Sequence, residues 1–170
     1  MEFTDLESKY LEKISNIIDS LKNIILNTNF DKHNIDIKYW YIFLNEIKNT
    51  IGNFNEKLSF LSCLLAKKYL MEIHEIEDFD VALKSQCAPG LDIDIYTKNG
   101  ERIIAEIKTT NSLYKNSLGA NQKEKICDDL NKLNKKVADY KYLFLTEENT
   151  HNIVNKNYGK KYKDINIIKL

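Results

Sequence analysis

The chain of 170 residues is predicted to be an α/β protein, with a mixed β-sheet flanked by helices and preceded by an N-terminal helical region. Apolar residues recur every three or four positions through the first part of the chain, as in amphipathic helices. Apolar and polar residues alternate on both sides of Asn99-Gly100, as in the two strands of a hairpin. Two more apolar strands follow, each after a helical pattern. Strands that alternate with helices indicate a sheet covered by helices.

Three helices are expected before the hairpin, over 4–27, 37–51 and 55–73. Thr4 can cap the first helix, and Glu7 three positions later completes a capping box. Gly52-Asn53 ends the second, because glycine accepts the backbone conformation that helix ends need. Residues 1–52 therefore form a helical N-terminal extension. The apolar stripe of the first helix packs against another helix of the chain or, as the alternative, against a second copy.

The later elements follow in the order strand, hairpin, helix, strand, helix, strand. They are expected over 79–83, 88–110, 118–136, 140–146, 147–157 and 164–170. Thr146 is the expected cap of the last helix. The run 140–146 is almost wholly apolar, which predicts a strand buried on both faces. The chain is predicted to be a single domain, residues 1–170, with its core over 53–170.

Composition narrows the classes of partner. Basic and acidic residues number 25 each, so the formal net charge is zero. Proteins that bind nucleic acid usually carry a basic surplus, so DNA binding here would depend on a local basic patch. Arg102 is the only arginine, which leaves base recognition to Lys, Asn, Gln or backbone groups. No apolar run is long enough for a bilayer and no signal-peptide pattern is present, so we expect a cytoplasmic protein with no membrane partner.

The loop length of the hairpin decides which residues lie opposite each other. A two-residue loop, Asn99-Gly100, would place Asp92 opposite Ile107 and mix apolar and charged residues on each face. A three-residue loop that begins at Lys98 and has Gly100 as its bulge residue places Asp92 opposite Glu106. In the first register apolar and charged residues would share each face, and a slip of one residue moves every side chain to the wrong face, so the second register is the one we expect.

In that register the charged residues of the hairpin gather on one face. They are Asp92, Asp94, Glu106 and Lys108, while Ile93, Ile95, Ile103, Ala105 and Ile107 share the other face. Carboxylate oxygens on adjacent strands suit a hard divalent cation such as Mg²⁺, which retains waters for a phosphate substrate. The alternative is a solvent-facing hairpin with charge pairs across it.

The chain resembles the PD-(D/E)xK nuclease superfamily in this hairpin. The resemblance lies in Pro89-Gly90-Leu91-Asp92, followed by Glu106-Ile107-Lys108 at the end of the next strand. The superfamily includes type II restriction endonucleases, Holliday-junction resolvases and repair nucleases, and its proline normally stands directly before the aspartate. Acid-x-Lys alone is a weak pattern that occurs five times in the chain, but only this copy ends an apolar strand opposite a Pro-Gly-x-Asp.

The resemblance implies a restriction-endonuclease-like fold and a set of site residues. Asp92, Glu106 and the carbonyl of Ile107 would hold Mg²⁺, or Mn²⁺ in its place. Lys108 would orient or help to deprotonate the attacking water. Asp94, which shares their face, would ligate a second metal or pair with Lys108.

Two further groups are implied less directly. The family often carries a supplementary glutamate on the helix before the core strands, for which Glu56 is the candidate and Glu72 and Glu75 are competitors. It also often contacts the DNA backbone just after its E-x-K strand, where Gln122, Lys123 and Lys125 open a helix here. For Glu56 the alternative is charge complementarity with the helix dipole, and for the other three a solvated polar face.

The expected activity is that of a type II restriction endonuclease, because the N-terminal helices exceed a minimal nuclease core. Its expected partners are DNA, a second copy in a homodimer that cuts two strands, and a cognate DNA methyltransferase in the same cell. The alternatives are a junction resolvase or repair nuclease, a catalytically silent DNA- or protein-binding member, and an unrelated α/β interaction domain.

Overall fold

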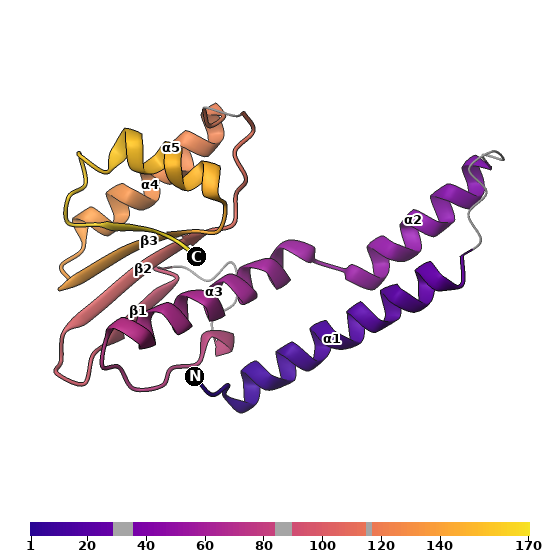
Figure 1. The fold of residues 1–170 in the computed structure, drawn as a ribbon, viewed down its shortest axis with the longest axis horizontal. Helices are drawn as coiled ribbons and strands as arrows, with labels where there is room; N and C mark the ends of the chain where they lie inside the picture. The colour runs from indigo at the N-terminus through magenta and orange to yellow at the C-terminus, as the bar shows by residue number, and fades with distance from the viewer. Residues whose placement is uncertain (29–35, 84–89, 115–116) are drawn as a thin grey trace. The chain divides into compact units, whose positions relative to one another are not determined.

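The computed structural model describes residues 1–28, 36–83, 90–114 and 117–170 (Figure 1). The chain divides into two compact units, Glu2–Lys57 and Leu58–Leu170. The second unit contains a four-stranded mixed sheet with helices, so the α/β class is confirmed. No helix among the described residues has both the length and the apolar character needed to cross a bilayer.

The first unit is helical. Its elements are α1 (Asp5–Leu26), α2 (Ile37–Ile51) and the first turn of α3 (Phe54–Ile73). The predicted capping box is present, since the Glu7 amide donates to Thr4 Oγ1 and the Thr4 amide donates to Glu7 Oε2. Gly52 ends α2 with φ of 62°. The three predicted N-terminal helices are therefore confirmed.

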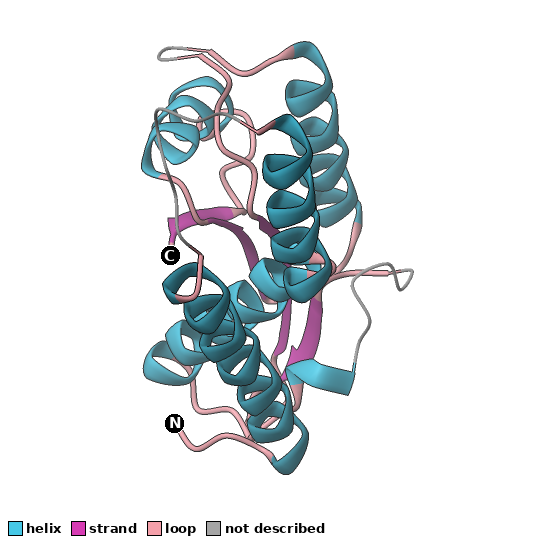
Figure 2. Ribbon diagram, turned by 90° about the vertical axis from the view of Figure 1, so that its right-hand side faces the viewer, coloured by secondary structure: helices cyan, strands magenta, loops and turns pink. Residues whose placement is uncertain are grey.

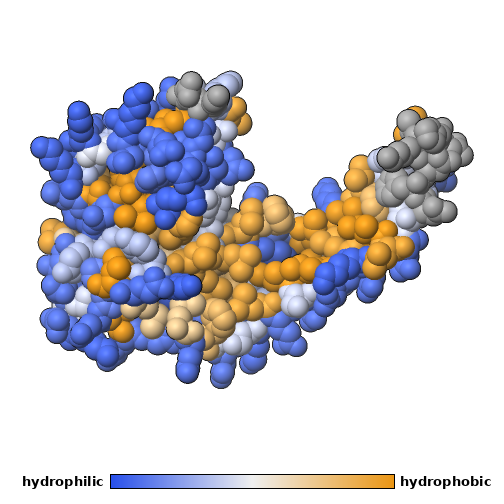
Figure 3. Space-filling view, in the orientation of Figure 1, coloured by the Kyte–Doolittle hydropathy of each residue, from blue (hydrophilic) through white to orange (hydrophobic). Residues whose placement is uncertain are grey.

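Helix α2 has no buried residue and carries a large apolar surface. Ile37, Tyr41 and Leu44 are 81, 70 and 55% exposed. Figure 3 shows orange, hydrophobic residues over the part of the surface that the N-terminal helices form. The expected homodimer stays a prediction.

The second unit is built on a β-sheet, whose strands are magenta in Figure 2. The strand order is β1-β2-β3-β4. The strands are β1 (Ile93–Tyr96), β2 (Arg102–Lys108), β3 (Tyr140–Leu145) and β4 (Asn166–Lys169). β1 pairs with β2 antiparallel, and the other two pairs are parallel. The parallel pairs are joined by α4 (Ala120–Lys135) and α5 (Glu148–Tyr158), as parallel connections require.

Helices cover both faces of this sheet, each over its own apolar core. On one face, Ile104, Leu143 and Leu145 pack with residues of α4 and α5. On the other, Ile103, Ala105 and Phe144 pack with Ala66 and Leu70 of α3. Strand β3 is buried on both faces, as its apolar run predicts.

Two local predictions are wrong. Residues 79–83 are not a strand, because Val81–Leu83 forms a 3₁₀ turn whose Ala82 amide donates to Asp80 Oδ1 at 2.7 Å. Aspartate side chains compete in this way with sheet pairing. The cap of α5 is Glu147 rather than Thr146, since its carboxylate accepts from the Asn149 and Thr150 amides.

Candidate active site

The hairpin has the register that brings the two key carboxylates together. Ile93 pairs with Ala105 and Ile95 with Ile103, which places Asp92 opposite Glu106. The loop closes through the Thr97 amide to the Glu101 carbonyl at 2.8 Å, and Gly100 has φ of 84°. The predicted three-residue loop is therefore confirmed.

The register also separates the two faces as predicted. Even-numbered Ile104 of β2 packs beneath α4, and odd-numbered Ile103 and Ala105 pack beneath α3. Asp92, Glu106 and Lys108 share the parity of Ile104, so they face the side of the sheet that α4 covers. This places the motif residues under a helix rather than in open solvent.

Asp92 is held by the neighbouring strand. Its Oδ2 accepts a hydrogen bond from the Ile107 amide at 2.8 Å. The bond ties the residue just before β1 to the middle of the Glu106-Ile107-Lys108 motif. Pro89, the remaining residue of the resemblance, lies outside the described residues.

Glu106 is a buried carboxyl with other carboxyls beside it. Its residue is only 3% exposed. Burial raises its pKa to about 7, Lys132 opposes that shift, and the neighbouring Asp92 and Asp129 add to it. A carboxyl group whose charge is disfavoured by burial and by like charges is one whose ionised form a cation would stabilise.

Helix α4 contributes two charged residues that sequence reasoning missed. Lys108 Nζ lies 2.6 Å from Asp129 Oδ2. Lys132 Nζ contacts both a carboxylate oxygen of Glu106 and the carbonyl oxygen of Gly90. Burial raises the pKa of Asp129, and the Lys108 ammonium opposes that shift.

A signal for Asp129 was present in the sequence. Ile126, Leu130 and Leu133 form the buried stripe of α4, and Asp129 lies three positions after the first of them and four before the last. That spacing puts a carboxylate on the core-facing side of the helix. A charged residue at such a position needs a partner, which here is Lys108.

The donor set fits a divalent cation. Glu106 Oε1 and Asp129 Oδ2 are buried and contact lysine ammoniums, but neither has a hydrogen bond of regular geometry. No group of three or more His, Cys, Asp or Glu side chains in the described part of the chain is arranged to hold a metal. An ion bound here would use two carboxylates, a backbone carbonyl and waters, which is an arrangement that Mg²⁺ accepts.

Asp94 pairs with Arg102, so its predicted pair with Lys108 is wrong, and its role as ligand of a second metal stays a prediction. Its carboxylate forms two bonds to the Arg102 guanidinium, at 2.7 and 2.9 Å. Arg102 also donates to the Val137 carbonyl at 3.0 Å. The pair of Asp94 and Arg102 lies nearer the hairpin turn than Glu106 and Lys108 do, and Lys108 pairs with Asp129 instead.

Glu56, the first candidate for the supplementary glutamate, lies in a different unit from Asp92 and Glu106. Glu56 belongs to the first unit, where its carboxylate accepts a hydrogen bond from the Tyr10 hydroxyl. Burial, and then Glu56, raise the pKa of Tyr10 to about 12. The catalytic role of Glu56 stays a prediction.

The last turn of α3 and its exit lie at the wrong end of the hairpin for a role beside Asp92. The Lys98 amide donates to the Glu75 carbonyl at 2.7 Å. Asp92 is six strand residues from Lys98, a distance of about 20 Å at ~3.3 Å per residue. The structure therefore argues against Glu75, and against Glu72 one turn earlier on α3.

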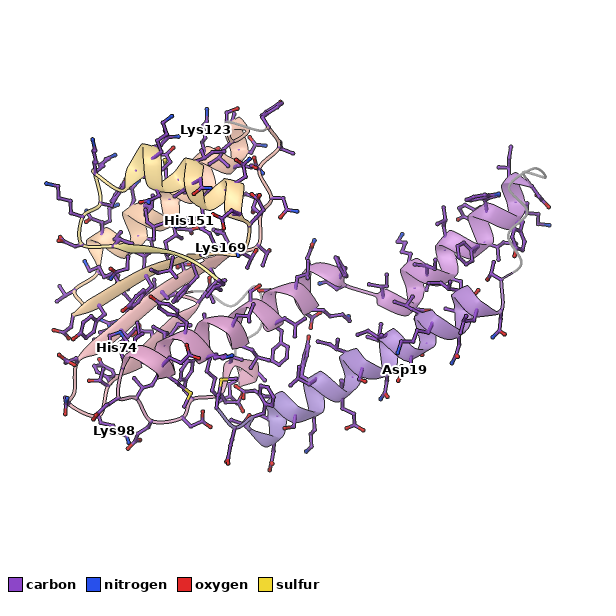
Figure 4. The ribbon with its side chains drawn as sticks, in the orientation of Figure 1. Asp19, His74, Lys98, Lys123, His151 and Lys169 are labelled. Atoms are coloured by element: carbon purple, nitrogen blue, oxygen red, sulfur yellow. The ribbon has the colours of Figure 1, made fainter. Side chains whose placement is uncertain are left out.

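The three residues predicted to contact DNA differ in their surroundings. The Gln122 side chain is used within the chain, because it accepts from the Gly119 amide and donates to the Asn111 carbonyl. Its amide thus fixes the start of α4. Lys123, labelled in Figure 4, and Lys125 are exposed. Lys125 lies one turn before Asp129, about 6 Å along the helix axis, and therefore on the same side of α4 as the site.

The loop from Lys108 to α4 is anchored by the start of α5. Glu147 accepts from the Ser112 amide and hydroxyl and from Thr150. The Thr150 hydroxyl and the amides around it hold the pKa of Glu147 at about 2. This anchor holds the segment that follows the lysine of the motif.

Comparisons of the chain with models of protein families, with curated proteins and with solved structures give no match. The assignment of a function therefore rests on the residues of this chain.

Proposed function

We propose that this protein is a Mg²⁺-dependent DNA endonuclease whose site consists of Asp92, Glu106 and Lys108. The observation that carries the proposal is the hairpin register, which pairs Asp92 with Glu106 and puts Lys108 on their face, beneath α4. A solvent-facing hairpin with charge pairs would not need to bury Glu106, whose residue is 3% exposed. Burial of a carboxylate beside other carboxyls is unfavourable, and Lys132 offsets only part of that cost, since the pKa of Glu106 is still raised to about 7. A site for a further cation is therefore the better explanation.

Each residue of the site has a role that follows from its surroundings. Asp92, oriented by the Ile107 amide, and Glu106 would hold Mg²⁺ together with the Ile107 carbonyl. The ion supplies charge neutralisation at the phosphate and lowers the pKa of bound water. Lys108 lies one residue beyond that carbonyl and orients the attacking water, while its positive charge balances charge at the phosphate.

Asp129 is the residue that positions Lys108. The two side chains meet at 2.6 Å, and both are largely shielded from solvent. A lysine has a flexible four-carbon stem, so a partner on a packed helix fixes where its ammonium lies. The same partner keeps the Lys108 side chain from rotating freely into solvent.

DNA is the proposed substrate, and a type II restriction activity is the leading form. The exposed Lys125 on the site-facing side of α4 supports contact with a phosphate backbone. The helical unit Glu2–Lys57 adds to what a minimal nuclease core would contain. A junction resolvase or repair nuclease of the same architecture is the second candidate, since it would use the same site on branched or damaged DNA.

The test is cleavage of mixed-sequence plasmid and phage DNA with Mg²⁺, with Mn²⁺ and with EDTA. Lys108→Ala is compared with Lys98→Ala, which makes the same change in the loop at the far end of the same hairpin. Discrete bands that need the metal and Lys108, but not Lys98, are the expected result.

Other outcomes would redirect or refute the proposal. Cleavage of branched but not duplex DNA would select the resolvase. Metal binding without cleavage of any DNA would indicate a silent binding member. If the protein binds neither metal nor DNA, the carboxylates serve only ion pairs and the proposal is refuted.

A further inference from the structure

The Lys132 ammonium lies at a position that a metal ion could occupy. Its ammonium contacts the Glu106 carboxylate and, at the same time, the Gly90 carbonyl. A carboxylate and a backbone carbonyl converging on one positive charge are the oxygen donors that a hard cation uses. One of them, Glu106, is the carboxylate that the proposed function assigns to Mg²⁺.

The local balance of charge makes Lys132 the counter-ion of that carboxylate. Three carboxyls lie together, those of Asp92, Glu106 and Asp129, and two ammoniums lie among them. Lys108 is paired with Asp129 at 2.6 Å. Lys132 is therefore the cation that faces Glu106, and Asp92 accepts a hydrogen bond from the Ile107 amide.

Lys132 is also placed so that it can leave. Its side chain is 37% exposed, whereas that of Glu106 is 5% exposed. The lysine stem is long and can swing towards solvent at little cost, but the glutamate on the central strand β2 cannot move away. Exchange of one cation for another at Glu106 therefore requires movement of the lysine only.

We propose that Lys132 is a built-in cation of the site, which neutralises Glu106 in the metal-free protein and is displaced when a divalent ion binds. The inference rests on the proposed function, because it takes the metal to bind at Asp92 and Glu106. The lysine keeps the buried carboxylate compensated while the site waits for metal. It also lowers metal affinity, since the ion must first break the Lys132 contacts.

The experiment measures Mn²⁺ affinity without DNA. Wild type, Lys132→Met and Lys135→Met are titrated at pH 8.5, with free Mn²⁺ followed by its electron paramagnetic resonance signal. Lys135, exposed in the last turn of α4, is the matched control for loss of one positive charge. Removal of a charge-assisted contact that competes with the ion is expected to tighten Mn²⁺ binding roughly tenfold or more, and the control is expected to change it less than twofold.

Thermal melting gives a second readout that activity does not enter. Lys132→Met is expected to lower Tm in EDTA, because Glu106 loses its partner, and to regain most of the loss in saturating Mn²⁺. If the methionine variant does not fold, Lys132→Gln, which retains a hydrogen-bond donor without charge, takes its place in both measurements.

The outcomes separate this inference from the proposed function. The inference would be refuted if Lys132→Met bound Mn²⁺ no more tightly than wild type, or if its loss of Tm were the same with and without Mn²⁺. In either case Mn²⁺ binding by wild type would still agree with the proposed function. If neither wild type nor Lys132→Met bound Mn²⁺, the inference and the proposed function would both be refuted.

Discussion

Replacement of Glu106 by Gln is predicted to stabilise the metal-free protein at neutral and alkaline pH while abolishing metal-dependent cleavage. Burial and the neighbouring Asp92 and Asp129 raise the pKa of Glu106 from 4.5 to about 7, despite the opposing effect of Lys132. The folded state therefore holds this proton more tightly than the unfolded state does. Stability is lost as pH rises from about 4.5 to about 7, and the loss is complete above that range.

The size of the effect follows from that difference in pKa. Each factor of ten in proton affinity is ~1.4 kcal/mol, so ionised Glu106 costs the folded protein up to about 3 kcal/mol above pH 7. Glutamine has nearly the same shape and carries no charge, so it removes this cost. For a chain of this length ~1 kcal/mol moves Tm by about 2–4 °C, so a rise of up to about 6–12 °C at pH 8 is expected.

The assay is thermal melting of wild type and Glu106→Gln in EDTA at pH 5 and pH 8, with Glu124→Gln as control. Glu124 is an exposed residue of α4. The two Tm values should nearly coincide at pH 5 and diverge at pH 8, and saturating Mg²⁺ should raise Tm of wild type only. A lower Tm for Glu106→Gln at pH 8, or a difference that does not depend on pH, would refute the reasoning.

The remaining predictions concern the helix and the loop beside the site. Asp129→Asn should slow cleavage by about tenfold to a hundredfold, because Lys108 loses its partner at 2.6 Å. It should also shift the pH profile of kcat with little loss of Tm. The control is Asp128→Asn at the exposed neighbouring position, and equal cleavage rates for the two variants would contradict the positioning role of Asp129. Glu147→Gln should weaken the loop anchor: because the folded pKa of Glu147 is lowered to about 2, its stabilisation is full above about pH 4.5 and is lost as pH falls towards 2. Urea unfolding at pH 6 and pH 3 should show that the free energy of unfolding falls less between these pH values in Glu147→Gln than in wild type or in the control Glu148→Gln. Identical falls in the three proteins would contradict the role of Glu147. Finally, removal of divalent metal from wild type should lower Tm, and an unchanged Tm would argue against a bound metal.

Local patterns were enough to predict most elements of this fold. The capping box of Thr4 and Glu7, the glycine at Gly52 and the hairpin loop at Gly100 all depend on neighbours within a few residues. Such features are decided by backbone sterics and short-range hydrogen bonds. The strand predicted over 79–83 failed for the same kind of reason, because the Asp80 side chain offered the backbone a local turn instead.

The sequence by itself determined that Asp92 faces Glu106, because a side-chain period of two leaves only one register that gathers the charged residues of the two strands on one face. Only the tertiary structure decided which residues of α4 complete the site. Asp129 and Lys132 reach Lys108 and Glu106 through the way in which the helix packs across the sheet, and that packing depends on core contacts between residues far apart in the chain. For the same reason periodicity could not show that Asp94 would be taken by Arg102.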